Sequence, residues 1–317
     1  MGGDFAPEQV ILGASQAVEE YGVEVVVVGV PERVQRLLEA HPRLRFVPAS
    51  QFIEMHEHPA QAVRSKPDSS MSVCARMCKA GEAAAWVSAG NSGAIMAAAL
   101  FLQGRVRGVD RPALGTVLPT AAQPAYFLDV GANVGSRPEF LVQFAQMGTI
   151  YAERVLGRET PTVGLLSNGE EESKGDELVR EASARLRRSS VNYTGNVEPK
   201  DVLAGRVDVV VADGFVGNLV IKMAEATADM IFRIMRDEIP RSLQGKAGGL
   251  LIRPGIARIR ARMDWREFGG APLLGIDGVA VVAHGRSDAR AIKNAVRVAK
   301  QAADADLVGK IREALGR

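Results

Sequence analysis

Residues 207–218 read VDVVVADGFVGN, a β-branched apolar run that ends in a polar, glycine-rich loop. The stretch that follows, Leu219–Glu238, is amphipathic with a helical period. The same succession of apolar run, small polar loop and helical stretch recurs along the chain. Near-continuous apolar strands that alternate with helices indicate a mostly parallel sheet covered on both faces.

The pattern extends over the whole chain, and no internal repeat or low-complexity linker divides it. We therefore expect residues 1–317 to form a single α/β domain, an α/β/α sandwich around a mostly parallel sheet. The expected strands are Val23–Val30, Leu44–Val47, Ala84–Ser88, Ala113–Val117, Tyr126–Val130, Thr162–Leu166, Val191–Thr194, Val207–Val211 and Val279–Ala283.

The first residues have an unusual reading. Met1-Gly2-Gly3-Asp4 resembles the loop that follows a strand, and Pro7 begins a predicted helix that reaches about Tyr21. The pattern therefore predicts a strand before Met1, outside the 317 residues.

Composition narrows the class of protein. The chain has 39 basic and 37 acidic residues, a formal net charge of +2, which argues against a protein that binds nucleic acid through bulk charge. No run reaches the roughly 18 apolar residues of a membrane-spanning helix, and no signal-peptide pattern opens the chain, so we expect a cytoplasmic protein.

Cys74 and Cys78 are spaced as two positions on one helix face, and we interpret them as small buried apolar residues.

Polar residues and glycines gather where the expected strands end. In an open parallel sheet, ligands bind beyond the carboxyl ends of the strands, and glycine-rich turns at helix starts leave backbone N–H groups free for an anion. Five such loops at successive strand ends predict one site for a phosphate-bearing or phosphate-accepting ligand. The loops are 89–93, 131–136 with Asp129 just before it, 167–175, 213–218 and 284–287.

Familiar nucleotide and metal motifs do not account for these loops. The sequence has neither GxGxxG after its first strand nor GxxxxGK[ST], which argues against a dinucleotide dehydrogenase or a P-loop ATPase. His56-Glu57-His58 is followed at once by Pro59 and has no further ligand cluster in view, so we expect no metal and no cofactor. Lys174 reads equally well as part of a solvated charged loop or as a cation that meets phosphate.

Taken together, six motifs closely resemble the PlsX-type phosphate acyltransferase family, in the same order and almost from end to end. The motifs are MGGDFAP (1–7), SAGNSGA (88–94), DVGANV (129–134), EEESKG (170–175), DGFVGN (213–218) and FGGAPLLGIDG (268–278). The resemblance implies a fold related to phosphotransacetylases and isocitrate-dehydrogenase-like proteins, a homodimer, and normally a strand before MGGD.

The resemblance also implies an activity and its residues. Inorganic phosphate attacks the thioester of acyl-acyl carrier protein and gives acyl phosphate, which a membrane acyltransferase uses to acylate glycerol 3-phosphate in phospholipid synthesis. The lysine of the ESKG motif and the asparagine of the GFVGN motif fall on Lys174 and Asn218, the expected catalytic residues. The residues expected to bind substrate are Asp4, Asn91, Ser92, Gly93, Asp129, Asn133, Asn168, Asp213 and His284.

These expectations combine into a mechanism. Lys174 meets the charge of phosphate or of the oxyanion, Asn218 hydrogen-bonds the carbonyl oxygen or phosphate, and backbone N–H groups of the Asn91-Ser92-Gly93 turn cradle phosphate. Two alternatives stay open: a phosphotransacetylase-type enzyme with an acyl-coenzyme A donor, and a non-catalytic, membrane-associated scaffold.

A basic amphipathic helical hairpin is expected at about residues 238–268. Leucine, isoleucine and methionine alternate there with arginines such as Arg258 and Arg260. Such a hairpin fits dimer contact, docking of an acidic carrier protein, or peripheral contact with anionic lipid. The fourth interpretation is a solvated helix pair with its apolar side on the core.

Overall fold

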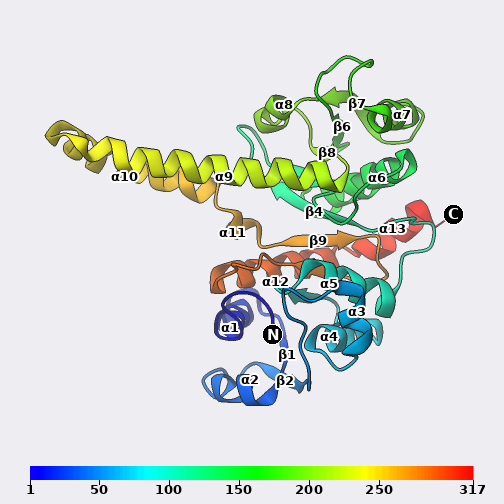
Figure 1. The fold of residues 1–317 in the computed structure, drawn as a ribbon, viewed down its shortest axis with the longest axis vertical. Coiled ribbons are helices and arrows are strands. Elements are labelled where there is room, and N and C mark those ends of the chain that lie inside the picture. Colours follow the sequence, from blue (N-terminus) through cyan, green and yellow to red (C-terminus); the bar gives the residue numbers. More distant parts are fainter. Residues whose placement is uncertain (317) are drawn as a thin grey trace.

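The computed structural model describes residues 1–316 and is built on an eight-stranded sheet with a second sheet of two strands (Figure 1). The order in the large sheet is β3-β10-β9-β4-β5-β8-β6-β7, and β1 pairs with β2 in the small one. The strands are β1 Val26–Gly29, β2 Arg45–Pro48, β3 Trp86–Ser88, β4 Ala113–Leu118, β5 Ala125–Leu128, β6 Thr162–Leu166, β7 Asn192–Val197, β8 Val209–Val211, β9 Ala271–Leu274 and β10 Ala280–Val282.

Two antiparallel strands divide the large sheet. β4 runs antiparallel to both β5 and β9, and β9 runs antiparallel to β10. The remaining neighbours, β3 with β10 and β5 with β8, β6 and β7, are parallel. The mostly parallel α/β fold is thus confirmed, but the two parallel groups point in opposite directions.

Helices cover both faces of the large sheet. Alternate residues of β5 show this: Tyr126 and Leu128 pack with α6, α7 and α13, whereas Phe127 packs with α8 and α9. The helices are α1 Glu8–Tyr21, α2 Pro31–Leu38, α3 Pro59–Ser65, α4 Ser70–Lys79, α5 Ser92–Ala98, α6 Pro138–Arg154, α7 Glu177–Leu186, α8 Pro199–Ala204, α9 Gly214–Glu238, α10 Leu243–Arg262, α11 Trp265–Phe268, α12 Ala289–Asp304 and α13 Leu307–Leu315.

A two-helix arm projects from this sandwich (Figure 1). It consists of the distal part of α9, a short 3-10 turn at Ile239–Arg241, and α10. Arg262, at the end of α10, anchors the arm by donating to the carbonyl oxygens of Thr120, Ala121 and Ala122. Much of the arm's apolar surface is exposed, including Leu243 at 85% and Leu251 at 83%.

The arm differs from its prediction in two ways. Its first limb is the long helix that begins at Gly214, well before the predicted start near residue 238. The interpretation that its apolar side lies on the core is wrong for α10, because none of the residues of that helix is buried. Within residues 1–316, no helix combines the length and the apolar character needed to cross a bilayer.

Candidate active site

The five predicted loops lie at two edges of the large sheet. The loops that follow β5, β6 and β8 share one edge, because these strands are parallel neighbours. The loops that follow β3 and β10 lie at the opposite edge, since β4 and β9 reverse the strand direction between the groups. The expectation that all five loops meet at a single edge is therefore wrong.

Asp129 organises the loop after β5. Its side chain is fully buried, and Oδ1 accepts N–H groups of Leu114 (3.0 Å), Gly131 (3.2 Å) and Ala132 (3.0 Å). Oδ2 accepts from the backbone and the side chain of Asn133, both at 2.8 Å. Burial raises the pKa of Asp129, and these donors oppose that rise.

The side chain of Asn133 is also used in hydrogen bonds within the protein. Its amide nitrogen donates to the carbonyl oxygen of Pro112 as well as to Asp129, both at 2.8 Å. The hydrogen-bonding capacity of Asp129 and Asn133 is thus largely spent on the shape of the loop. This arrangement favours a positioning role for both residues over direct contact with substrate.

The start of α9 packs directly on the Asp129 loop. Asp213 caps the helix by accepting the N–H of Phe215 (2.9 Å), and its other oxygen accepts the N–H of Ser136 (2.8 Å). A Cβ built at Gly217 would lie 1.9 Å from the carbonyl oxygen of Asp129, so only glycine permits this approach.

Asn218 follows immediately and lies against Gly131. A Cβ built at Gly131 would lie 3.6 Å from the carboxamide carbon and nitrogen of Asn218, and Gly131 itself has a φ of +132°. Asn218 is half-buried, and its amide has no hydrogen-bond partner within residues 1–316. The amide is therefore available to a ligand at the carboxyl ends of β5 and β8.

Lys174 lies on the neighbouring loop, after β6. Asn168 Oδ1 accepts the N–H of Gly175 (2.9 Å) and closes this loop, while Asn196 holds the carbonyl oxygen of Glu171 (3.1 Å). Lys174 is exposed, and its ammonium group forms no hydrogen bond or ion pair in the described part of the chain. Lys174 and Asn218 belong to loops at the same sheet edge, and no hydrogen bond joins them within residues 1–316.

The acidic residues around Lys174 pair with other cations. Glu172 pairs with Arg187, and Glu170 lies 3.7 Å from the ammonium of Lys200 and 3.5 Å from the guanidinium of Arg206. The positive charge of Lys174 is consequently not neutralised by Glu170 or Glu172.

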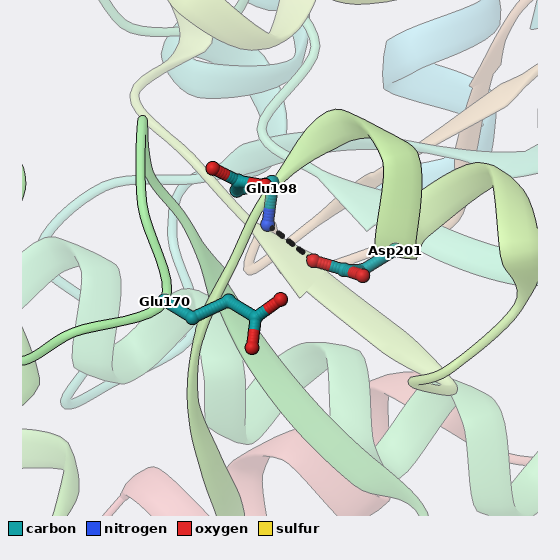
Figure 2. Close-up of side chains that lie close together, drawn as sticks. All are labelled: Glu170, Glu198 and Asp201. Carbon is teal, nitrogen blue, oxygen red and sulfur yellow. Dashed lines mark hydrogen bonds between the residues drawn. The ribbon is translucent and has the colours of Figure 1, made fainter.

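Figure 2 shows Glu170 beside Glu198 and Asp201 of the α8 start. Carboxylate oxygens of the three lie within 4.8 Å of one another, and the N–H of Glu198 donates to Asp201 (3.0 Å). Arg206 lies 2.8 Å from the buried Asp201, and Lys200 pairs with Glu198. Because two cations already compensate the three carboxylates, we interpret the cluster as an ion-pair network that fastens the Lys174 loop to α8.

The opposite edge carries the remaining predicted residues. Asn91 caps α5 by accepting the N–H of Ala94 (3.1 Å), and its amide donates to the carbonyl oxygens of Met55 (3.1 Å) and Glu57 (3.0 Å). Ser92 is exposed, and a Cβ at Gly93 would meet the ring of Pro59. Asn91 thus ties three segments together.

Asp4 and His284 lie close to each other at this edge. The N–H of Asp4 donates to the carbonyl oxygen of Gly285 (2.8 Å), and His284 Nδ1 accepts the N–H of Arg286 (3.1 Å). The His284 ring is tilted against Trp265, with centroids 5.2 Å apart. Partial burial lowers the pKa of His284, and the nearby positive charge of Arg286 lowers it further.

Helix α9 links the two edges. Asn218, Lys222 and Glu225 share one of its faces, because they are spaced four and three residues apart. Lys222 contributes to the electrostatic environment of His284, and Arg286 to that of Glu225. The sequence motifs include neither Lys222 nor Glu225. The sequence feature that could have identified them is their helical spacing from Asn218, which places all three residues on one helix face.

Sequence comparisons find related proteins over almost the whole chain. A family model described as "Fatty acid synthesis protein" matches residues 1–310. The chain is 47% identical over 321 residues to a phosphate acyltransferase of Desulfitobacterium hafniense (strain Y51), covering 100% of this chain and 96% of the relative. It is 48% identical over 318 residues to a phosphate acyltransferase of Cyanothece sp. (strain PCC 7425 / ATCC 29141), covering 98% and 92%.

A solved structure shares the architecture at low sequence identity. A phosphotransacetylase from Streptococcus pyogenes superposes with a TM-score of 0.65 at 17% identity, covering 95% of this chain and 92% of that one. Identity this low supports a common fold and does not extend to the substrate.

Proposed function

The chain belongs to the family of fatty acid synthesis proteins that includes curated phosphate acyltransferases, and on that premise we propose that Lys174 and Asn218 carry its reaction. The enzyme forms acyl phosphate from acyl-acyl carrier protein and inorganic phosphate, a step of lipid biosynthesis. The observation that carries this conclusion is the 47% identity over the full chain to a phosphate acyltransferase.

In the proposed reaction, a phosphate oxygen attacks the carbonyl carbon of the thioester. A C–O bond forms, the C–S bond breaks, and the thiol of the carrier leaves with the electron pair and takes up a proton. The oxyanion that develops on the way needs hydrogen-bond donors or positive charge. Lys174 supports this role because its ammonium group is unpaired within residues 1–316, and Asn218 because its amide is free there.

Lys222 and Arg286 extend the proposed phosphate site. Lys222 lies one helical turn after Asn218, and both cations influence His284. Lys222, one turn from the free amide of Asn218, and Arg286, near His284, would supply positive charge to a dianion. We propose that Lys222 and Arg286 bind phosphate before it attacks.

The predicted substrate contacts of Asp4, Asn91, Ser92, Gly93, Asp129, Asn133, Asn168, Asp213 and His284 remain predictions. Ser92 and His284 offer exposed polar groups, which supports a direct contact. The side-chain hydrogen bonds of Asn91, Asp129 and Asp213 support an indirect role, in which they hold the loops in place.

Variants of the two proposed catalytic residues test the assignment. Lys174→Ala and Asn218→Ala should each lower turnover on the order of a hundredfold or more, because each removes one donor to developing charge. Lys310→Ala on α13 is the matched control, since Lys310 pairs only with Glu313 among residues 1–316 and lies on the surface. Near-normal turnover of a folded Lys174→Ala or Asn218→Ala variant would remove that residue from the mechanism.

We also propose that the arm joins two copies of the chain into a homodimer. Exposed apolar residues occur along both of its helices, among them Met223, Ile234 and Leu250. An apolar surface of this extent is typical of a protein interface. Sedimentation should give a dimer, and Leu250→Asp with Leu251→Asp should shift it towards monomer. A wild-type monomer would contradict the proposal.

The charge of the arm supports a second role. Helix α10 carries basic residues and no acidic residue, so it is suited to an acidic carrier protein or to peripheral contact with anionic lipid. Arg258→Glu with Arg260→Glu should raise the KM for the carrier substrate or weaken binding to liposomes. No change in either would leave α10 without this role.

We place the enzyme in the cytoplasm, where its product would pass to a membrane acyltransferase that acylates glycerol 3-phosphate. The basic arm supports a position near the membrane surface. The alternative with an acyl-coenzyme A donor rests only on the phosphotransacetylase fold, at 17% identity, and we do not propose it.

A further inference from the structure

Two arginines stack on one aromatic ring at the edge of the candidate active site. The guanidinium carbon of Arg137 lies 4.5 Å from the centroid of the Phe140 ring, and that of Arg111 lies 6.0 Å from it. Phe140 is buried and belongs to the main apolar core, so its ring is a fixed platform. An aromatic ring attracts a guanidinium group over its face. The ring thus holds both cations near each other before any ligand binds.

The backbone of both arginines is restricted as well. Each of them precedes a proline, Pro112 or Pro138, and a residue before proline is biased towards extended conformations. Arg137 accordingly has a φ of −99° and a ψ of 157°. The two segments are joined by Asn133, whose side-chain amide donates to the carbonyl oxygen of Pro112 (2.8 Å). The fold therefore fixes where the two side chains start, and the ring limits where they end.

No carboxylate neutralises this pair of arginines. Within residues 1–316, Arg111 and Arg137 form no ion pair and no side-chain hydrogen bond, and both are exposed. The acidic residues next to them in sequence are engaged elsewhere: Asp110 accepts a glutamine amide (3.2 Å), and Glu139 pairs with an arginine of α7 (2.8 Å). Exposed guanidinium groups without a counter-ion favour an anionic ligand, because their N–H donors match a carboxylate or a phosphate.

The arginine pair lies at the same sheet edge as the residues proposed to act on the thioester. Arg111 precedes β4 and Arg137 follows β5, and these antiparallel neighbours bring both to the edge that carries Asn218. Ser136, next to Arg137, donates its N–H to Asp213 at the start of α9 (2.8 Å). The arm of α9 and α10 projects from the sandwich (Figure 1), so the basic residues of α10 form a separate surface.

We propose that Arg111 and Arg137 form a docking site for the acidic surface of the acyl carrier protein. The inference rests on the proposed function, because it takes the donor to be a thioester borne by an acidic protein. A carrier holds its acyl group at the end of a prosthetic arm, so it docks beside the reacting residues and not on them. Fixed cations at the rim of a site speed encounter with an acidic partner and set its orientation. The attacking phosphate has a different proposed site, at Lys222 and Arg286.

Charge reversal of the two arginines tests the proposal. The glutamate pair, Arg111→Glu with Arg137→Glu, replaces both cations. The lysine pair, Arg111→Lys with Arg137→Lys, keeps both charges but loses the planar guanidinium fork. The control pair, Arg36→Glu with Arg43→Glu, makes the same change in net charge on two exposed arginines, one on α2 and one just before β2.

The readouts are the Kd of the carrier protein in its thiol form, measured by fluorescence anisotropy, and the KM for palmitoyl-acyl carrier protein and for inorganic phosphate. The glutamate pair should raise the Kd and the carrier KM at least about tenfold and change kcat and the phosphate KM less than about twofold. The increase should shrink at high ionic strength, because salt screens exposed charges. The lysine pair should lie between the wild type and the glutamate pair, and the control pair should match the wild type.

Three results would overturn the proposal. The first is an equal carrier Kd in the glutamate pair and the control pair. The second is a raised phosphate KM in the glutamate pair with an unchanged carrier Kd, which would make the arginines a phosphate site. The third is loss of binding to phosphatidylglycerol vesicles with an unchanged carrier Kd, which would make them a lipid contact. Failure of the proposed reaction is a distinct result, because the wild-type protein itself would then show no turnover of the carrier substrate.

Discussion

Gly217→Ala probes the contact that positions Asn218. Gly217 lies in the first turn of α9, where a Cβ would be 1.9 Å from the carbonyl oxygen of Asp129. Ordinary contact begins at 3.4 Å, so the helix start and the Asp129 loop would have to separate by more than an ångström. Neither partner is a flexible side chain, because both contacting groups belong to backbone held by hydrogen bonds.

The magnitude follows from two opposing effects. Overpacking of a tight contact costs about 1–3 kcal/mol. Alanine in a helix recovers about 0.5–1 kcal/mol relative to glycine. We therefore expect a net loss of about 1–2 kcal/mol in the free energy of unfolding. Asn218 moves with its neighbour, and a displacement near 1 Å in a catalytic group costs on the order of a hundredfold in rate.

Gly248→Ala is the matched control, because a Cβ at this helical glycine of α10 meets nothing within 4 Å. It should keep full turnover and raise stability by about 0.5–1 kcal/mol. Urea unfolding and acyl phosphate formation are measured on both variants. Wild-type turnover and stability in Gly217→Ala would refute the argument that this contact positions Asn218.

Three further predictions concern other parts of the chain. The double variant Cys74→Ala, Cys78→Ala should stay active. Burial raises the pKa of both thiols, that of Cys74 to about 11, so neither is a reactive thiolate near neutral pH. A folded but inactive double variant would instead support a route through an acyl-cysteine. The pKa of His284 is lower in the folded protein than in the unfolded chain, so the unfolded chain binds the proton first as the pH falls. The free energy of unfolding should therefore decrease as the pH falls through about 6.5. Urea unfolding of His284→Asn should show a smaller loss, and an identical pH dependence would contradict this. Arg206→Met should lower the free energy of unfolding by about 1 kcal/mol, because it leaves buried Asp201 without its cation; unchanged urea unfolding would exclude Arg206 as a stabilising partner.

Most strands could be predicted because buried β-branched runs are distinctive. β6 occupies the predicted Thr162–Leu166. β9 was not predicted, since Ala271–Leu274 is short and contains Pro272. The directions of β4 and β9 could not be deduced either, because a strand buried on both faces reads the same in parallel and antiparallel pairing. That ambiguity is why the loops were expected at one edge.

The sequence predicted candidate site residues best where the side chain has no hydrogen-bond or ion-pair partner within residues 1–316. The resemblance predicts Lys174 and Asn218 as catalytic residues, and both have unpaired polar groups in residues 1–316. Asp129 is predicted to bind substrate, and that stays a prediction; its carboxylate accepts N–H groups of its own loop and of Leu114 on β4, which the sequence did not indicate. Lys222 was overlooked because a lysine on an amphipathic helix ordinarily indicates only a solvated face.

The most direct test of the central claim is phosphate-dependent release of carrier thiol from palmitoyl-acyl carrier protein, with palmitoyl-coenzyme A in parallel. We predict release from the carrier substrate alone, and no release without phosphate. Release from coenzyme A alone would contradict the carrier assignment. Absence of release from both would contradict the assigned reaction and leave only the fold.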